Sequence, residues 1–252
     1  MAATELIFGQ HAVREVLERS PELVLGLMIA RGADSPRMQA LVEAAQQFGI
    51  HADRAARSKL DQLAGGGRHQ GIVARVRSRP ARSEDELARL LDALDEPPLL
   101  LALDGVTDPR NLGACLRTAD AGGVHAVIAP RDRAAGLTPA ARKAACGAAE
   151  SVPFFQVTNL ARSLRRLKDA DVSLLGAAED APASLYAADL TGALCLVLGA
   201  EGRGLRRLSR ELCDRMVALP MRGSVESLNV AVAAGVLIYE ARRQRDAKRG
   251  HS

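Results

Sequence analysis

The sequence of 252 residues has few aromatic side chains, which make up 2% of the chain and include no tryptophan. So few rings exclude a surface that stacks the bases of single-stranded nucleic acid. Apolar runs are short, and none reaches the roughly 18 residues that a membrane span requires, so we expect no membrane partner. The first residues also lack the basic and then apolar pattern of a secretory signal. Together these absences favour a cytoplasmic protein.

Cysteine is scarce as well, and the four cysteines lie far apart without a Cys-x-x-Cys pair. This spacing excludes a zinc site and a disulfide framework, and it predicts small buried side chains in a reducing compartment. The five histidines show no ligand spacing, so we expect no metal. The motifs of zinc peptidases, serine hydrolases and EF-hands are missing. The cysteines are Cys115, Cys146, Cys195 and Cys213.

Lysine occurs only four times, whereas arginine occurs 30 times, and the net charge is +4. Arginine binds phosphate through two parallel hydrogen bonds, so its excess favours a nucleic-acid partner. A GC-rich genome, whose codons favour arginine and alanine, explains the same excess. Composition alone leaves both explanations open.

Residues 1–76 have the pattern of a small α/β unit, because short apolar runs alternate with segments of helical spacing. The expected strands cover residues 6–8, 23–30 and 71–76, and the expected helices cover 10–18 and 36–48. Ser35 and Pro36 are the expected N-cap and first residue of the second helix. Residues 77–96 begin with a polar, proline-containing stretch, which predicts a linker with a short helix over 83–94.

From residue 97 the chain alternates between strand and helix patterns. Most of these strand runs are continuously apolar, which is typical of strands covered on both faces. We therefore predict an α/β fold in which residues 97–252 form an open parallel sheet with helices on both sides. The expected strands cover 99–103, 124–128, 154–157, 172–175, 194–198 and 216–219, and two of the expected helices cover 139–149 and 159–168.

In such sheets, ligands bind beyond the carboxyl ends of the strands. After the first strand, Asp108 and Pro109 predict the start of a helix, whose N-terminus suits an anion. Gly113 and Arg117 are four residues apart, so they share a helix face, and the glycine leaves room for a ligand to approach the guanidinium. Asn111 would act from the mouth of the helix. A surface arginine and a turn asparagine are the alternative interpretation.

A glycine-rich loop, Gly199 to Gly204, follows the strand at 194–198. Its spacing differs from the dinucleotide-binding pattern, and Leu205 stands where a phosphate-binding P-loop needs lysine. Glu201 would repel polyphosphate and fits a cationic or hydroxyl-bearing ligand better. The alternative is a tight turn with an exposed glutamate.

Beyond the strand at 216–219, Pro220 opens a loop that leads into a helix. The apolar residues from Val225 to Ile238 surround this helix almost completely, which predicts that it is buried. Ser227 and Asn229 would then be polar groups at the buried N-terminus of this helix, and buried polar groups need hydrogen-bond partners.

These three strand ends resemble the three motifs of the SpoU/TrmH branch of the SPOUT RNA 2′-O-ribose methyltransferases. The segments are Asn111-x-Gly113-x-x-x-Arg117-Thr118-Ala119, Leu198-Gly199-x-Glu201-Gly202-x-Gly204 and Leu219-Pro220-Met221-x-Gly223-x-x-x-Ser227-Leu228-Asn229-Val230. Two further segments resemble the substrate-binding domain of the bacterial members that methylate a guanosine ribose in 23S rRNA. They are Phe8-Gly9-x-His11-Ala12-Val13-x-Glu15-x-Leu17 and His69-Gln70-Gly71-Ile72-Val73-Ala74. The resemblance covers about residues 4–245.

The resemblance implies a catalytic domain with a deep trefoil knot over 97–252, preceded by a small RNA-binding domain similar to a ribosomal-protein fold over 1–76. It implies a homodimer that uses S-adenosyl-L-methionine to methylate the ribose 2′-hydroxyl of a specific guanosine in 23S rRNA. The backbone around Gly199, Leu219 and Leu228 would hold the cofactor. The family assigns catalytic roles to the residues that match Asn111, Arg117, Glu201, Ser227 and Asn229.

Arginine is a poor general base because its pKa exceeds about 12, so we expect Arg117 to clamp the phosphate next to the target ribose. Glu201 and Asn229 would position Arg117 and the substrate, and Ser227 would bond within its loop or to the ribose. Two alternatives are a non-catalytic RNA-binding protein of the same fold and an enzyme that methylates a tRNA ribose.

Overall fold

A computed structural model describes residues 4–77, 82 and 84–250, which divide into two compact units, Met1–Pro80 and Ala81–Ser252. The first unit contains a four-stranded sheet in the order β1-β4-β2-β3. β1 and β2 run antiparallel to β4, and β3 runs parallel to β2. The elements are β1 (Thr4–Phe8), α1 (Gln10–Arg19), β2 (Val24–Ala30), α2 (Pro36–Gln47), β3 (Ala52–Ala55), α3 (Arg57–Ala64) and β4 (Ile72–Arg77).

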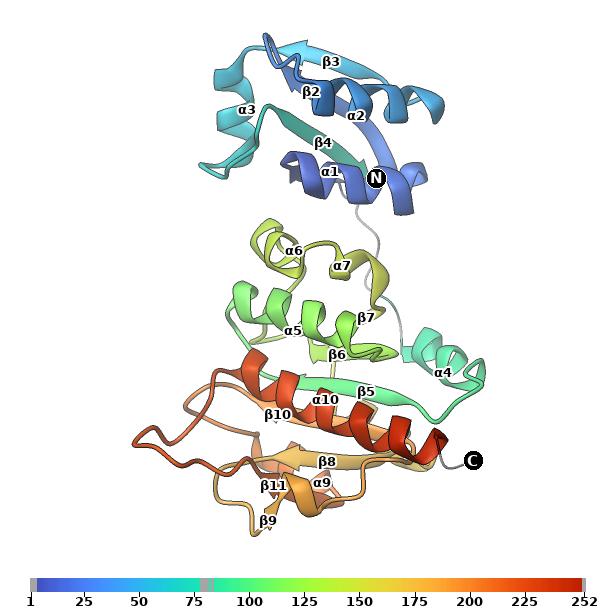
Figure 1. The fold of residues 1–252 in the computed structure, drawn as a ribbon, viewed down its shortest axis with the longest axis vertical. Coiled ribbons are helices and arrows are strands. Elements are labelled where there is room, and N and C mark those ends of the chain that lie inside the picture. Colours follow the sequence, from blue (N-terminus) through green and yellow to red (C-terminus); the bar gives the residue numbers. More distant parts are fainter. Residues whose placement is uncertain (1–3, 78–81, 83, 251–252) are drawn as a thin grey trace. The chain divides into compact units, whose positions relative to one another are not determined.

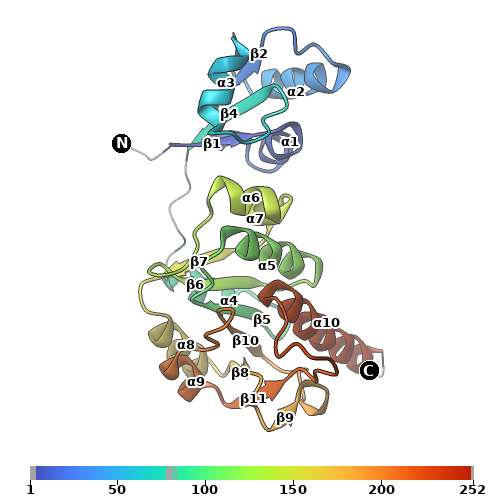
Figure 2. The same ribbon diagram turned by 90° about the vertical axis from the view of Figure 1, so that its left-hand side faces the viewer.

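Helices cover both faces of this first sheet (Figure 2). α1 and α2 bury Val16, Leu17 and Leu41 against one face, and α3 buries Leu60 against the other. The Ser35 side chain accepts a hydrogen bond from the Met38 N–H at 3.3 Å, which confirms the expected N-cap of α2.

β3 and α3 are two elements that the sequence pattern did not predict. β3 is an edge strand with exposed charged residues, and α3 buries only two of its eight residues. Neither segment therefore carries a clear apolar period.

The second unit contains a seven-stranded sheet in the order β7-β6-β5-β10-β8-β11-β9, and its recorded strand pairs are all parallel. The strands are β5 (Leu99–Asp104), β6 (Ala126–Pro130), β7 (Phe154–Val157), β8 (Ser173–Ala177), β9 (Ala183–Ser184), β10 (Leu194–Gly199) and β11 (Arg215–Ala218). The helices are α4 (Glu84–Asp92), α5 (Pro109–Ala121), α6 (Pro139–Ala145), α7 (Ala148–Ser151), α8 (Leu160–Asp169), α9 (Arg207–Leu212) and α10 (Val230–Arg249). The predicted parallel α/β sheet is confirmed, although two-residue β9 was not foreseen.

The central strand β5 is buried on both faces, as its continuous apolar run predicted. Leu99, Leu101 and Leu103 pack with α5, α6 and α10, whereas Leu100 and Ala102 pack with α4 and α8. Figure 2 shows this sheet nearly edge-on, with α8 and α9 on one side and α5 and α10 on the other. Among the described residues, no helix combines the length and the apolar character that crossing a bilayer requires.

Three local expectations differ from the structure. The helix expected over 139–149 breaks at Cys146 and Gly147, which both have positive φ angles. The helix within the expected linker, α4, packs Leu87 into the core of the second unit, so it belongs to that unit. Ser83, the first residue of the helix expected there, lies outside the described residues. The cysteines were expected to be buried, but Cys146 is exposed.

α10 is fixed at its C-terminal end by a buried arginine, Arg245, which is 6% exposed. Its guanidinium donates to the carbonyls of Pro97 and Pro98, just before β5, and to those of Leu190 and Gly192, just before β10. One side chain thus ties α10 to the amino ends of two central strands. Figure 1 shows α10 lying across β5 and β10.

We expect Arg245→Met to lower the free energy of unfolding by about 2–4 kcal/mol, because four hydrogen bonds from a buried guanidinium to backbone carbonyls are lost while the volume stays filled. Arg249→Met is the matched control on the same helix, since it removes only an exposed ion pair with Glu96 and should cost less than about 1 kcal/mol. Urea unfolding of both variants measures the difference. Equal losses would contradict the role assigned to Arg245.

Candidate active site

Three loops at the carboxyl edge of the second sheet meet at the side chain of Glu201. Its Oε1 accepts hydrogen bonds from Asn111 Nδ2 at 3.1 Å, from Asn229 Nδ2 at 2.6 Å and from the Val230 N–H at 3.2 Å. Asn229 Nδ2 also donates to Asn111 Oδ1 at 3.0 Å. One carboxylate thus joins the loops that follow β5, β10 and β11. We call Asn111, Glu201 and Asn229 the Glu201 cluster.

Helix starts position both asparagines. Asp108 caps α5 by accepting a hydrogen bond from the Arg110 N–H at 2.8 Å, and Asn111 therefore lies in the first turn, as expected. Asn229 is the N-cap of α10, and its Oδ1 accepts from the Ala231 N–H at 3.0 Å. Glu201 accepts from the first N–H of α10, that of Val230, where a negative charge is favoured by the helix dipole.

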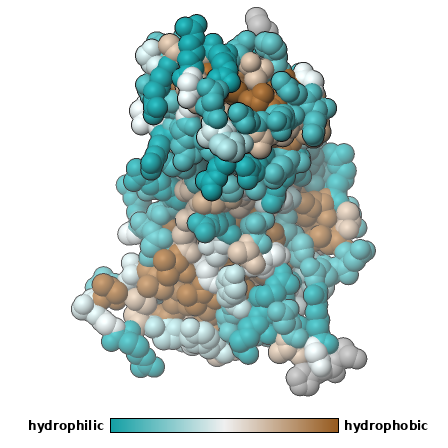
Figure 3. All heavy atoms as spheres, turned by 45° about the horizontal axis from the view of Figure 1, so that its top comes forward, coloured by the Kyte–Doolittle hydropathy of each residue, from teal (hydrophilic) through white to brown (hydrophobic). Residues whose placement is uncertain are grey.

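The helix after the third loop was predicted to be buried together with its N-terminal end, and this prediction is wrong for several of the residues on which it rested. α10 begins only at Val230, so Val225 lies in the loop, where it is 60% exposed, and Val232 on the helix is 53% exposed. Ser227 and Asn229 are also exposed. The apolar pattern shows that these positions avoid charge, but it cannot distinguish a buried face from an uncovered one. Figure 3 shows hydrophobic residues gathered on the surface of the second unit.

Gly199 makes the turn after β10 very tight. A Cβ atom there would overlap the backbone of Gly204 and Leu205, because the loop folds back and pairs Ala200 with Gly204. Any larger residue at this position would push the two arms of the loop apart. The close approach shapes one wall of a cavity.

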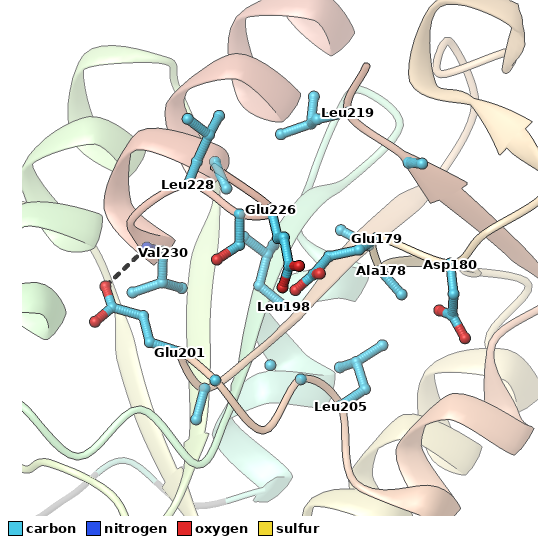
Figure 4. A pocket seen from close by; sticks show the side chains of 18 of the residues that line it. Ala178, Glu179, Asp180, Leu198, Glu201, Leu205, Leu219, Glu226, Leu228 and Val230 are labelled. Carbon is cyan, nitrogen blue, oxygen red and sulfur yellow. Dashed lines mark hydrogen bonds between the residues drawn. The ribbon is translucent and has the colours of Figure 1, made fainter. Parts of the chain in front are cut away.

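This cavity has a volume of about 700 Å³ and lies beside Glu201 (Figure 4). Gly199, Leu219, Leu228 and Ser227 line it, together with Leu198. Its size is within the usual range for a small-molecule site. The structure therefore brings the three residues expected to hold a cofactor to one cavity, next to two of the residues expected to act in catalysis.

Acidic side chains lie on the other wall of the cavity. Figure 4 shows the carboxylates of Glu179 and Glu226 pointing toward one another, with Asp180 farther along the same loop as Glu179. Asp180 pairs with Arg210 of α9 at 2.9 Å, and this hydrogen bond lowers the pKa of the carboxyl. This acidic wall was not predicted from the sequence. The segment carries no motif, and the only feature of the sequence that could have pointed to it is its position directly after the strand expected at 172–175.

Arg117 lies in the third turn of α5, away from the helix N-terminus that was expected to suit an anion, and it is absent from the residues that line the cavity. Gly113, one turn earlier, does not leave room for a ligand, because a Cβ atom there would overlap the Ala141 carbonyl of α6. The guanidinium of Arg117 is exposed, and its Nη1 donates to Cys146 Sγ at 3.5 Å.

Within the described ranges, no group of three His, Cys, Asp or Glu residues could hold a metal ion.

Two family models match the chain. The SpoU rRNA Methylase family matches residues 98–239, and the model for RNA 2'-O ribose methyltransferase substrate binding matches residues 6–81. The chain belongs to the SpoU rRNA methylase family. The first model covers the Glu201 cluster and the cavity, and the second covers nearly all the described elements of the first unit.

Curated relatives of this SpoU protein extend over almost its whole length. A Yersinia pestis protein named 23S rRNA (guanosine-2'-O-)-methyltransferase RlmB is 52% identical over 97% of this chain and 99% of its own. The protein of the same name from Escherichia coli K12 is 51% identical over 96% of this chain and 99% of its own.

Solved structures of SpoU proteins share the fold. The SpoU methyltransferase AviRb from Streptomyces viridochromogenes, in complex with the cofactor AdoMet, has a TM-score of 0.81 and 27% identity over 97% of this chain and 91% of its own. The A. aeolicus TrmH/SpoU tRNA modifying enzyme has a TM-score of 0.54 and 29% identity, over 66% of this chain and 85% of its own. The match to this tRNA enzyme therefore leaves a third of the chain uncovered.

We expect Gly199→Ala to lower the free energy of unfolding by about 2–4 kcal/mol, because the new methyl group meets backbone that cannot move aside without opening the turn. Gly192→Ala is the control in the same unit, since a Cβ there has nothing within 4 Å. Thermal unfolding of both variants provides the measurement. A Gly199→Ala protein as stable as the control would show that the turn opens freely.

Proposed function

We propose that this chain transfers the methyl group of S-adenosyl-L-methionine to the ribose 2′-hydroxyl of a specific guanosine in 23S rRNA, in the cytoplasm. The observation that carries the proposal is the junction of all three family motifs at the Glu201 carboxylate, beside a cavity of cofactor size. Relatives named for this reaction align with the chain from end to end.

The cavity fits the cofactor by size and by charge. Leu198, Leu219 and Leu228 give it an apolar wall for a ring, and Glu179 and Glu226 give it negative charge for a cationic ligand. No P-loop lysine is present to favour a polyphosphate instead. The backbone around Gly199, Leu219 and Leu228 would hold the cofactor, which supplies a methyl group on a positively charged sulfonium.

The protein's own residues would align the ribose. Glu201 fixes both amides of its cluster, so Asn111 and Asn229 present rigid groups to the substrate. The three described donors to Glu201 all reach Oε1, which leaves Oε2 able to accept a hydrogen bond from the substrate. Ser227 would bond to the ribose or within its loop. Such positioning is a large part of the barrier reduction in a displacement between two bound groups.

Arg117 would clamp the phosphate next to the target ribose through its planar pair of donors. Because Arg117 does not line the cavity, the clamp and the cofactor belong to different surfaces of the unit. A homodimer with the active site near its interface would bring such surfaces together. Val232 and Tyr239, seven residues apart on α10 and 53% and 54% exposed, support a partner subunit there. A trefoil knot, which the family resemblance implies, stays a prediction.

The first unit would select the RNA. The substrate-binding model matches residues 6–81, and the tRNA enzyme aligns with only two thirds of the chain. We therefore propose that residues 1–76 form the substrate-binding domain and residues 97–252 the catalytic domain, joined by residues 77–96, of which α4 packs on the catalytic domain. This arrangement favours rRNA over tRNA as the substrate.

We expect the purified chain to bind S-adenosyl-L-methionine but not NAD or ATP in calorimetry, and to methylate 23S rRNA from cells that lack this activity. Mass spectrometry of the digested rRNA should find one ribose-methylated guanosine. Transfer to tRNA alone would favour the tRNA alternative, and RNA binding without cofactor binding would favour a non-catalytic protein.

We expect Arg117→Lys to lower the methylation rate roughly 30- to 1000-fold, because lysine keeps the charge but loses the two-pronged contact with phosphate. Cofactor affinity should stay unchanged because the cofactor is expected in other loops. The melting temperature should also stay unchanged because the Arg117 side chain is exposed. Arg165→Lys, at an exposed position of α8 on the other face of the sheet, is the matched control. Near-normal turnover in Arg117→Lys and Arg117→Ala would make Arg117 a surface residue.

We expect removal of residues 1–76 to leave a folded protein that binds the cofactor but methylates RNA weakly or without selectivity. The second unit has its own core and sheet, which supports independent folding. The measurements are calorimetry with the cofactor and methyl transfer to 23S rRNA and to tRNA. Unchanged rRNA activity would show that the first unit does not select the substrate.

A further inference from the structure

Cys146 has an unusual backbone at the end of α6. Its φ is +51°, a left-handed conformation that favours glycine, and Gly147 follows with φ +96°. Only four described residues other than glycine have a positive φ, and Cys146 is the one among them whose side chain contacts Arg117. The turn ends α6 and aims the cysteine side chain at α5.

The thiol lies between two polar groups. Cys146 Sγ accepts from Arg117 Nη1 at 3.5 Å and donates to the Lys143 carbonyl at 3.6 Å. Because the carbonyl takes the thiol hydrogen, a sulfur lone pair is left to face the guanidinium. The other cysteines do not share this setting, since Cys115 and Cys195 are buried and the Cys213 thiol donates to the Ser209 carbonyl.

Close helix packing fixes the position of this thiol. Gly113 lets the backbone of α6 lie directly on α5, where the nearest atoms include the Ala141 carbonyl and the Ala145 nitrogen. Cys146 follows immediately, one helical turn farther along α5, at the level of Arg117. A glycine whose space is filled by α6 therefore sets the distance between the thiol and the guanidinium.

We propose that Cys146 is a positioning residue, whose thiol holds the Arg117 guanidinium in the orientation that clamps the substrate phosphate. The inference rests on the proposed role of Arg117. An exposed arginine has many rotamers, and ordering it when RNA binds costs conformational entropy. A fixed acceptor beside Nη1 restricts those rotamers before the substrate arrives, and it leaves Nη2 and Nε free to form the phosphate contact.

The test is a double-mutant cycle with methyl transfer to 23S rRNA. We expect Cys146→Ala to lower kcat about fivefold to tenfold, with the KM for RNA changed less than about twofold and cofactor affinity unchanged in calorimetry. In an Arg117→Ala background, Cys146→Ala should have no further effect, because the guanidinium that it positions is gone. Cys146→Ser should restore part of kcat, since a hydroxyl also accepts a hydrogen bond.

The matched control is Asp171→Ala. Asp171 is an exposed residue at the end of α8 with φ +56°, so it tests the same truncation on the same strained backbone away from Arg117. It should leave kcat unchanged. If Cys146→Ala unfolds, Cys146→Gly removes the thiol while suiting the left-handed turn, and it should show the same loss of kcat.

A second measurement does not depend on turnover. Burial raises the pKa of both Cys115 and Cys213 to about 12 and also raises that of Cys195, so a maleimide should modify Cys146 first. Bound 23S rRNA should slow this modification at least about fivefold, as followed by mass spectrometry, because phosphate at Arg117 covers the thiol. Modification at the same rate with and without RNA would overturn the proposal.

Each outcome of the cycle is decisive. Additive losses in the double variant would overturn the proposal, because they show a structural defect unrelated to Arg117. Normal kcat in Cys146→Ala, together with a large loss in Arg117→Ala, would overturn it while leaving the proposed function intact. Normal kcat in Arg117→Ala would instead refute the clamp itself, on which this inference rests.

Discussion

The second unit depends on one carboxylate oxygen that joins its own loop to two other stretches of chain by accepting three hydrogen bonds. Glu201 Oε1 joins the first turn of α5 to the N-cap and first residue of α10. The Val230 N–H would otherwise be an unpaired backbone donor at a helix start, and the same carboxylate also holds two amide side chains, so one side chain fixes three loops. The residues expected to act in catalysis are thereby also the residues that hold the carboxyl edge of the sheet together.

Two glycines set the distances around this junction, and each does so because it has no side chain. Gly199 lets its loop fold back on β10, which forms the cavity wall, and Gly113 lets α6 lie against α5. The cavity and the Arg117 neighbourhood are therefore shaped by backbone contacts. Backbone contacts tolerate little movement, and this rigidity suits a site whose main task is alignment of a hydroxyl, a methyl group and a leaving sulfur.

Much of this fold could be predicted from the sequence, because buried parallel strands are continuous apolar runs and because Asp108-Pro109 is a clear helix start. β3 and α3 escaped prediction, since their polar, exposed residues carry no period. The motifs located Asn111, Glu201 and Asn229, but only the structure shows that they bond to one another. Glu179 and Asp180 carry no motif, and their place on the cavity wall follows from strand order, which the local pattern does not encode.

The exposed residues of α10 and the position of Arg117 both support the proposed homodimer. Val232 and Tyr239 leave an uncovered apolar stripe on α10, and α5, which carries Arg117, packs beside that helix. A second subunit seated on the stripe would therefore also lie close to α5. An arginine outside its own cavity is then in a suitable place to serve a site built from two subunits, and the apolar sequence that falsely predicted burial within one chain would instead reflect burial between two.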